Sequence, residues 1–276
     1  MTEAETIAQT PQDAPITQSS LVRDLRALGL QPGSTVIVHS SLSKFGWVAG
    51  GAVAVIQALE EVITSAGTLV MPAHSGDLSE PSYWVAPPVP ESWWPIIRAE
   101  MSVYQPDLTP TREMGVIAET FRKQQGVLRS AHPHHSFTAW GAQCEWITAR
   151  HSLSNGLSEE SPLARIYDLD GWVLLLGVTH ANNTSLHLAE YRRSGPKEME
   201  RQGAPLSING ERRWVECDTL AIDSDDFAAL GEDYERETGA VARGRVGCAD
   251  GRLMRQRPLV DYAVQWMQTH RQPITA

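Results

Sequence analysis

One apolar run, from Trp172 to Leu176, contains no polar residue. A short unbroken run of this kind is typical of a strand buried on both faces, as in a sheet covered by helices. Gly177 ends the run, and a polar stretch follows it. The residues from Ser185 to Tyr191 then predict a helix, with Asn183 or Thr184 as its N-cap. A buried strand that leads into a capped helix is a common place for the chemistry of an α/β protein.

Two further runs, Thr35 to Val38 and Thr68 to Met71, also predict buried strands. Between them, the residues that follow Gly51, as far as about Ala66, predict a helix. The apolar positions on its inner face are Val53, Ile56, Leu59 and Ile63. A strand, a loop, a helix and a second strand in this order imply parallel strands with a right-handed crossover. The sequence therefore predicts an α/β fold with a central, mostly parallel sheet flanked by helices.

Shorter amphipathic segments predict further helices over 21–28, 113–123, 143–150, 161–166, 225–237 and 259–267. The Asn209-Gly210 pair predicts a β-hairpin over 206–215, which forms a C-terminal hairpin and helix region with the last two helices. The stretch 246–253 receives no assignment. The long segment from His74 to Pro110 is rich in tryptophan and proline. Its aromatic and acidic side chains suit the wall of a pocket for a cationic ligand, although a packed surface flap explains the same residues.

The chain termini and the cysteines bear on the compartment. Residues 1–19 are polar and lack the basic and apolar regions of a signal peptide, so we expect a disordered tail there and a single domain over 20–276. No apolar run reaches the length of a transmembrane helix. Cys144, Cys217 and Cys248 lie far apart and form no C-x-x-C pair. This spacing favours a reducing cytoplasm over a disulfide framework or a zinc site.

The net charge of −10 limits the choice of partner. Nucleic acids and anionic membranes select for basic surfaces, so neither is expected to bind this chain. A cationic small molecule fits the charge, although acidity that serves only solubility is the more common case.

The loop from His39 to Gly51, HSSLSKFGWVAGG, lies between the first strand and the next helix. It offers three hydroxyl groups, one ammonium group and two glycines directly before a helix N-terminus. Backbone N–H groups and the helix dipole bind phosphate at such a position. The pattern matches neither the Walker loop nor the dinucleotide fingerprint, and a tight strand-to-helix turn accounts for it equally well.

Two groups of histidines invite a chemical interpretation. His187 and Glu190 are three residues apart and share one face of the predicted helix, as a base and its orienting carboxylate would, although an ordinary surface helix also shows such pairs.

A cluster of three histidines suggests a metal site, and its members are His132, His134 and His135. We expect no metal there, because proline breaks any helix at position 133 and neighbouring side chains diverge.

Taken together, the motifs resemble those of the aminoglycoside N3-acetyltransferase family, which has the antibiotic N-acetyltransferase fold and not the GNAT fold. The resemblance covers about 20–270 and rests on VHSSLSKFGWVAGG, SEPSYW with PPVPESWW, LTPTREMG, RSAHPHHSFTAWG, ESPLAR and LLLGVTHANNTSLHLAEY. It implies an enzyme that transfers acetyl from acetyl-CoA to the 3-amino group of 2-deoxystreptamine antibiotics. A homodimer is a further possibility.

The resemblance also implies roles for individual residues. The coenzyme A site would comprise Ser40, Ser41, Leu42, Ser43, Lys44, Val48, Gly50, Gly51, Thr109, Arg112, Arg129 and Ser130. The cationic substrate would contact Asp77, Glu80 and Tyr83. His187 would be the general base, Glu190 its support, and Thr184 a donor to the oxyanion.

Direct transfer in a ternary complex is the expected mechanism, because no cysteine is well placed for a covalent acyl-enzyme. Three alternatives to this function stay open: acetylation of a different amine, coenzyme A binding without catalysis, and a metal-dependent hydrolase that uses the histidines.

Overall fold

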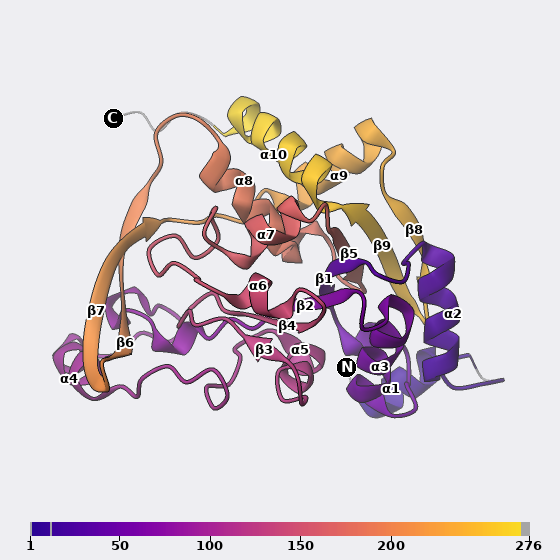
Figure 1. Cartoon of the computed structure of the whole chain (residues 1–276), viewed down its shortest axis with the longest axis horizontal. Coiled ribbons are helices and arrows are strands. Elements are labelled where there is room, and N and C mark those ends of the chain that lie inside the picture. The colour runs from indigo at the N-terminus through magenta and orange to yellow at the C-terminus, as the bar shows by residue number, and fades with distance from the viewer. Residues whose placement is uncertain (1, 12, 272–276) are drawn as a thin grey trace.

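The fold is built around one seven-stranded sheet. The computed structural model describes residues 2–11 and 13–271 and places the strands in the order β3-β4-β2-β1-β5-β9-β8 (Figure 1). Their bounds are β1 Thr35–Ser40, β2 Thr68–Pro72, β3 Leu128–Arg129, β4 Phe137–Gly141, β5 Trp172–Leu176, β8 Ala242–Val246 and β9 Ala249–Arg255. The three strands predicted from apolar runs are therefore confirmed, and they lie side by side in the middle of the sheet.

Parallel pairing is confined to this middle. β1 pairs in parallel with β2 on one side and with β5 on the other, while β4, β3, β9 and β8 continue the sheet in antiparallel fashion. The predicted α/β class and helix-flanked central sheet are confirmed. The sheet as a whole is mixed, because its outer strands pair through hairpins. The apolar runs of the central strands do not predict these hairpins.

Ten α-helices lie in the described part of the chain. They are α1 Glu3–Gln9, α2 Gln18–Leu28, α3 Gly51–Ile63, α4 Trp94–Glu100, α5 Gly115–Phe121, α6 Cys144–Thr148, α7 Pro162–Asp168, α8 His187–Arg192, α9 Phe227–Thr238 and α10 Gln256–His270. None of the helices in the described ranges is both long and apolar enough to cross a membrane.

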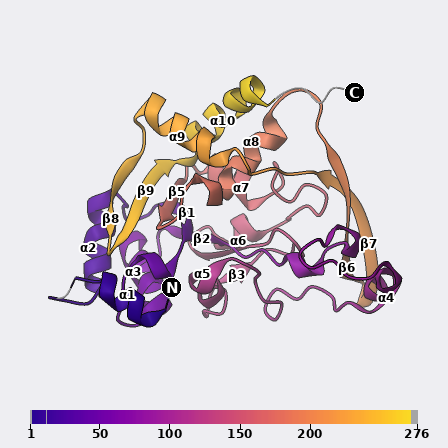
Figure 2. The ribbon, with the colours of Figure 1, turned by 180° about the vertical axis from the view of Figure 1, so that it is seen from behind.

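Helices α2, α3 and α5 cover one face of the sheet, and α6 to α10 cover the other (Figures 1 and 2). Side chains of α2, α3 and α5 make one core, and those of α6 to α10 make the other. The alternation of a strand explains the division, because Val36 and Val38 of β1 join the first core while Ile37 joins the second. The predicted inner face of α3 needs one correction: Val53 is 51% exposed, and Val55 is buried instead.

The stretch 246–253, left unassigned by the sequence, contains the turn between β8 and β9. Gly247 supplies a positive φ of 59° at this turn, which an L side chain rarely adopts. The predicted Asn209-Gly210 turn is confirmed, and it joins β6 Met199–Ile208 to β7 Glu211–Leu220. This hairpin stands apart from the central sheet in both views and lies beside α4, where Arg212 donates to the carbonyl oxygens of Arg98 and Met101.

The N-terminal segment differs from the expected disordered tail over 1–19. Thr2 and Glu5 form a capping box that begins α1, a signal that the sequence carries in the spacing T-x-x-E. Trp47 holds the segment to the core, because its indole N–H donates to Glu3 at 3.2 Å and its backbone N–H donates to Thr10 Oγ1 at 2.6 Å. Residues 1 and 12 lie outside the described residues. The segment is thus folded against the loop that follows β1.

Candidate active site

His187 and Glu190 form a hydrogen-bonded pair at the start of α8. The His187 Nδ1 atom lies 2.5 Å from Glu190 Oε2, as the spacing of three residues on a helix predicts. The His187 side chain is 12% exposed and lies against the ring of Phe227, with 4.8 Å between the ring centroids. The bond at Nδ1 and the packing on Phe227 fix the orientation of the imidazole and leave its Nε2 atom available for chemistry.

The second oxygen of Glu190 is held from the other side. Glu190 Oε1 accepts from Arg271 Nη1 at 2.5 Å and from the backbone N–H of Asp223 at 3.0 Å. Burial alone would raise the pKa of this carboxyl group, but the bonds from His187 and Arg271 outweigh burial and the pKa is lowered. Glu190 is therefore a fixed anion. Arg271 was missed by the sequence argument, because it lies 81 residues from Glu190 and no local spacing connects the two.

Asn183 sets the local path of the chain before His187. Its side chain accepts from the backbone N–H of Ser185 at 3.2 Å, which confirms it as the cap and begins a short 3-10 turn over Thr184–Leu186 that leads directly into α8. Thr184 itself is buried and lines a cavity of about 110 Å³. The side chains or backbone of Ser40, His39 and Glu113 line the same cavity. The cavity thus lies at the carboxyl ends of the parallel strands, where α/β folds bind their ligands.

Most of the predicted coenzyme A residues lie together in the loop between β1 and α3. Leu42, Ser43, Val48, Gly50 and Gly51 line a cavity of about 560 Å³, and α1 forms its opposite wall. Both glycines have positive φ, 89° and 57°, and a Cβ at Gly51 would meet nothing within 4 Å. Backbone conformation rather than crowding therefore explains the glycine at position 51.

Three further predicted residues of this loop are polar, namely Ser40, Ser41 and Lys44. Ser41 and Ser43 are hydrogen-bonded to each other at 3.2 Å, and Ser40 lines the smaller cavity. Lys44 lines a third cavity with Arg245 and Arg252, and its ammonium group has no hydrogen-bond or ion-pair partner among the described residues. The loop therefore presents hydroxyl groups and one free cation, which suits a phosphate-bearing ligand.

Arg129 and Ser130 are hydrogen-bonded within the protein. The Arg129 guanidinium donates to the carbonyl oxygens of Ala73, Pro106 and Thr109, and to the Ser136 hydroxyl. Four of its five N–H groups are thus engaged, and the contacts fix both ends of the long segment after β2. Ser130 is 1% exposed and receives the backbone N–H of Phe137 at 2.9 Å.

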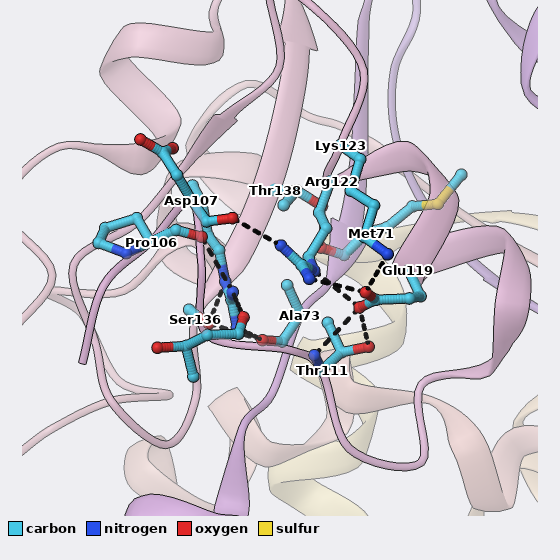
Figure 3. A network of polar contacts seen from close by, with 12 residues as sticks. Met71, Ala73, Pro106, Asp107, Thr111, Glu119, Arg122, Lys123, Ser136 and Thr138 are labelled. Atoms are coloured by element: carbon cyan, nitrogen blue, oxygen red, sulfur yellow. Dashed lines mark hydrogen bonds and ion pairs between the residues drawn. The ribbon is translucent and has the colours of Figure 1, made fainter. Parts of the chain in front are cut away.

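A second arginine strengthens this anchorage (Figure 3). Arg122 donates to the Asp107 carbonyl oxygen at 3.0 Å and forms a two-point pair with Glu119, which in turn accepts from Thr111. Thr109 closes a turn by accepting from the Gln105 N–H. These contacts favour a scaffolding role for Arg129, Ser130 and Thr109, and their contact with coenzyme A stays a prediction.

The predicted substrate carboxylates are both paired with arginines. Asp77 forms an ion pair with Arg112, which joins a residue predicted for the substrate to one predicted for coenzyme A. Glu80 is buried and accepts two bonds from Arg98 of α4, at 2.5 and 3.0 Å. Tyr83 is 47% exposed. Asp77 and Tyr83 are accessible to a ligand, while the charge of Glu80 is already compensated within the protein.

In the histidine cluster, the rings of His132 and His134 are hydrogen-bonded to backbone groups. His132 Nδ1 accepts from the backbone N–H groups of His134 and His135, at 3.1 and 2.9 Å, and His134 Nε2 contacts the Leu78 carbonyl oxygen. His151, on a later loop, packs against His132 and bonds to Ser130. Within the described ranges, no group of three or more His, Cys, Asp or Glu side chains is arranged to hold a metal ion.

Comparison with known proteins identifies the family. The family model described as aminoglycoside 3-N-acetyltransferase matches residues 37–268. The chain is 48% identical to the SPbeta prophage-derived aminoglycoside N(3')-acetyltransferase-like protein YokD of Bacillus subtilis (strain 168), over 91% of this chain and 92% of that protein. It is 36% identical to aminoglycoside N(3)-acetyltransferase VII of Streptomyces paromomycinus, over 93% of each.

Solved structures agree in fold over almost the whole length. The crystal structure of YokD matches with a TM-score of 0.94 and 44% identity, covering 97% of this chain and 98% of that one. AAC-IIIb, solved as a binary complex with CoASH, matches with a TM-score of 0.82 and 29% identity, covering 95% and 100%. Because the family model spans most of the chain and relatives share a third or more of its residues across nearly their full length, this protein belongs to the aminoglycoside 3-N-acetyltransferase family.

Proposed function

We propose that the protein transfers the acetyl group of acetyl-CoA to the 3-amino group of a 2-deoxystreptamine aminoglycoside, with His187 as the general base. The observation that carries this proposal is the His187–Glu190 pair, held at 2.5 Å at the start of α8. Thr184, three residues before His187, lines a cavity at the carboxyl ends of β1 and β2. Membership of the family supplies the reaction class, and the complex of AAC-IIIb with CoASH supplies the nature of the donor.

The residues around the loop after β1 fit the acetyl donor. The backbone at Gly50 and Gly51, the hydroxyls of Ser41 and Ser43, and the free ammonium of Lys44 are groups that bind a pyrophosphate. When bound, acetyl-CoA supplies an acyl thioester, which an amine can attack. Ser40 and Thr184 line the smaller cavity, one at the end of β1 and the other shortly before α8, so they suit the acyl end of the donor.

His187 performs the proton transfers. It takes a proton from the substrate ammonium group, and the freed lone pair of the nitrogen forms the new C–N bond. Glu190 stabilises the imidazolium that results, since it remains ionised between His187 and Arg271. As the C–S bond breaks, the sulfur takes the bonding electrons, and the proton held by His187 neutralises the thiolate. The nitrogen loses its second proton to solvent as the amide forms. The products are an amide and free coenzyme A.

One structural observation favours a second candidate, acetylation of a smaller amine that is not an antibiotic. A polycationic substrate needs uncompensated carboxylates, yet Asp77 and Glu80 are paired with Arg112 and Arg98. A substrate with a single amino group would need only the base and the smaller cavity, which Ser40 and Thr184 line. The two candidates differ in their substrate and share the same catalytic residues.

A thiol-release assay tests the proposal. Purified protein and acetyl-CoA are mixed with gentamicin, tobramycin, apramycin, neomycin and simple amines, with and without EDTA, and free coenzyme A is measured. We expect turnover with the aminoglycosides in both conditions, and a loss of about 10² to 10⁴ in kcat for His187→Ala, with the Kd for acetyl-CoA unchanged by calorimetry.

The exposed His270 provides the control, since His270→Ala removes a histidine at the end of α10 that bonds to and stacks on Trp266. Full turnover in His187→Ala would show that another group is the base. Turnover with simple amines but none of the drugs would favour the second candidate. Loss of activity in EDTA would favour the metal-dependent alternative.

A further inference from the structure

His39 is the penultimate residue of β1 and lies opposite Leu175 of β5. Because side chains alternate along a strand, His39 faces the same side of the sheet as Ile37, which is the side covered by α7 to α10. α8, with His187, belongs to this layer. The strand therefore delivers His39 to the carboxyl edge of the sheet on the side of the general base.

The imidazole of His39 has no hydrogen-bond partner among the residues that the structure describes. The residue is 8% exposed, its Nε2 atom is buried, and no group in the described residues bonds to that atom. Buried polar atoms are almost always hydrogen-bonded, so an unpaired one needs an explanation. His39 lines the cavity of about 110 Å³ together with Ser40 and Thr184, so a molecule bound in this cavity can supply the missing partner.

The protonation state of His39 restricts its role. Burial, with a smaller contribution from the nearby His187, lowers the pKa of His39 to about 3. A histidine that stays neutral is a poor general base at neutral pH, but it retains one N–H group and can donate a hydrogen bond. The position beside the proposed acyl site suits a neutral donor that polarises a carbonyl group.

We propose that His39 is a second catalytic residue, which donates a hydrogen bond to the carbonyl oxygen of the acetyl thioester and to the oxyanion that forms on attack. Thr184, across the same cavity, is the natural second donor. This inference rests on the proposed acetyl transfer, and it assigns to His39 a task that is separate from proton removal by His187.

The thioester carbonyl gives a direct readout. Infrared difference spectra of [1-¹³C]acetyl-CoA report the C=O stretch, which moves to lower frequency when the oxygen accepts a hydrogen bond. We expect this shift on binding to the wild-type protein and its loss on binding to His39→Leu. We also expect kcat to fall about 10²- to 10³-fold in His39→Leu, the usual cost of losing one oxyanion donor. The Kd for acetyl-CoA should change less than threefold.

Two variants control for folding. His39→Gln keeps an N–H group at a similar distance from the backbone, so it should retain part of the shift and part of kcat. This variant keeps the proposal testable even if His39→Leu is poorly folded. Among the described residues, the Nε2 atom of His74 is also buried and unpaired, but His74 does not line the cavity. His74→Leu should therefore lower the melting temperature without removing the carbonyl shift.

The outcomes separate the two proposals. Failure of the wild-type protein to bind acetyl-CoA would overturn both the proposed function and the role of His39. Binding without a carbonyl shift, or a shift that persists in His39→Leu, would overturn the role of His39 alone and leave acetyl transfer standing.

Discussion

Glu190 accepts three hydrogen bonds on two oxygen atoms, and only one of the three comes from His187. Glu190→Gln keeps the size of the side chain but removes its charge. We expect kcat to fall by about 10² or more, because the amide cannot stabilise an imidazolium as a carboxylate does. The Kd for acetyl-CoA should stay the same, because Glu190 lies outside the loop between β1 and α3. Steady-state kinetics and calorimetry measure the two quantities.

Asp226 offers a matched control for this change. It also bonds to Arg271, at 2.6 and 2.8 Å, but it makes no contact with His187. Asp226→Asn therefore removes a carboxylate from the same arginine while leaving the catalytic pair intact, and kcat should change by less than about threefold. Equal losses in the two variants would show that Arg271, and not the charge beside His187, sets the rate.

The site was predictable where its residues are close in sequence. His187 and Glu190 share a helix face, so their spacing foretold their contact, and the glycines before α3 foretold a loop that lines a cavity. Arg271 and His39 were not identified as parts of the site. Their roles come from the chain folding back across the sheet, which no local spacing records. The resemblance places Arg129 in the coenzyme A site, and this contact stays a prediction. The fold adds what the motif does not show, because Arg129 bonds to three backbone carbonyl oxygens and to the Ser136 hydroxyl.

The N-terminal helix α1 illustrates the same limit for a whole element. Apolar periodicity is weak over Glu3–Gln9, so the segment looked disordered, but capping and contacts with Trp47 hold it in place. The strands of the sheet centre were predictable because they are buried on both faces and carry unbroken apolar runs. The β8–β9 hairpin was not, because Ala242–Val246 is largely exposed and carries two arginines.

Deletion of residues 2–9 tests what α1 does. Glu3 and Thr6 form part of the cavity that also contains Leu42, Ser43 and Gly51. We expect the deletion to raise the Kd for acetyl-CoA about fivefold to tenfold, a loss of roughly 1 kcal/mol, while kcat at saturation is kept. Calorimetry gives the Kd, and Glu5→Gln, which removes a charge from α1 outside the cavity lining, serves as the control. An unchanged Kd would mean that α1 packs beside the cofactor loop without contributing to the site.

Most histidines of the protein are buried or half-buried, and this should govern its stability in acid. Burial lowers the pKa of seven of the nine, which are His39, His74, His132, His134, His135, His151 and His180. The values are about 3 for His39 and His74 and about 4 for His151. Unfolded histidine titrates near pH 6.5, so between these values the unfolded chain binds more protons than the folded one.

Stability should therefore be fully present above pH 6.5 and fall as the pH drops toward 4, by about 1.4 kcal/mol per pH unit for each such histidine. Carboxylates such as Glu190, whose pKa is lowered, lose their contribution only below about pH 4.5, so the two effects occupy different windows. Three histidines alone would lower the free energy of unfolding by about 4 kcal/mol per pH unit. A typical protein has a free energy of unfolding of about 5–15 kcal/mol, so unfolding is expected near pH 5. Urea unfolding at pH 7, 6 and 5 measures the slope. His151→Gln should reduce that slope by one proton, and a free energy of unfolding that is constant from pH 7 to pH 5 would contradict the assignment of these histidines as buried and neutral.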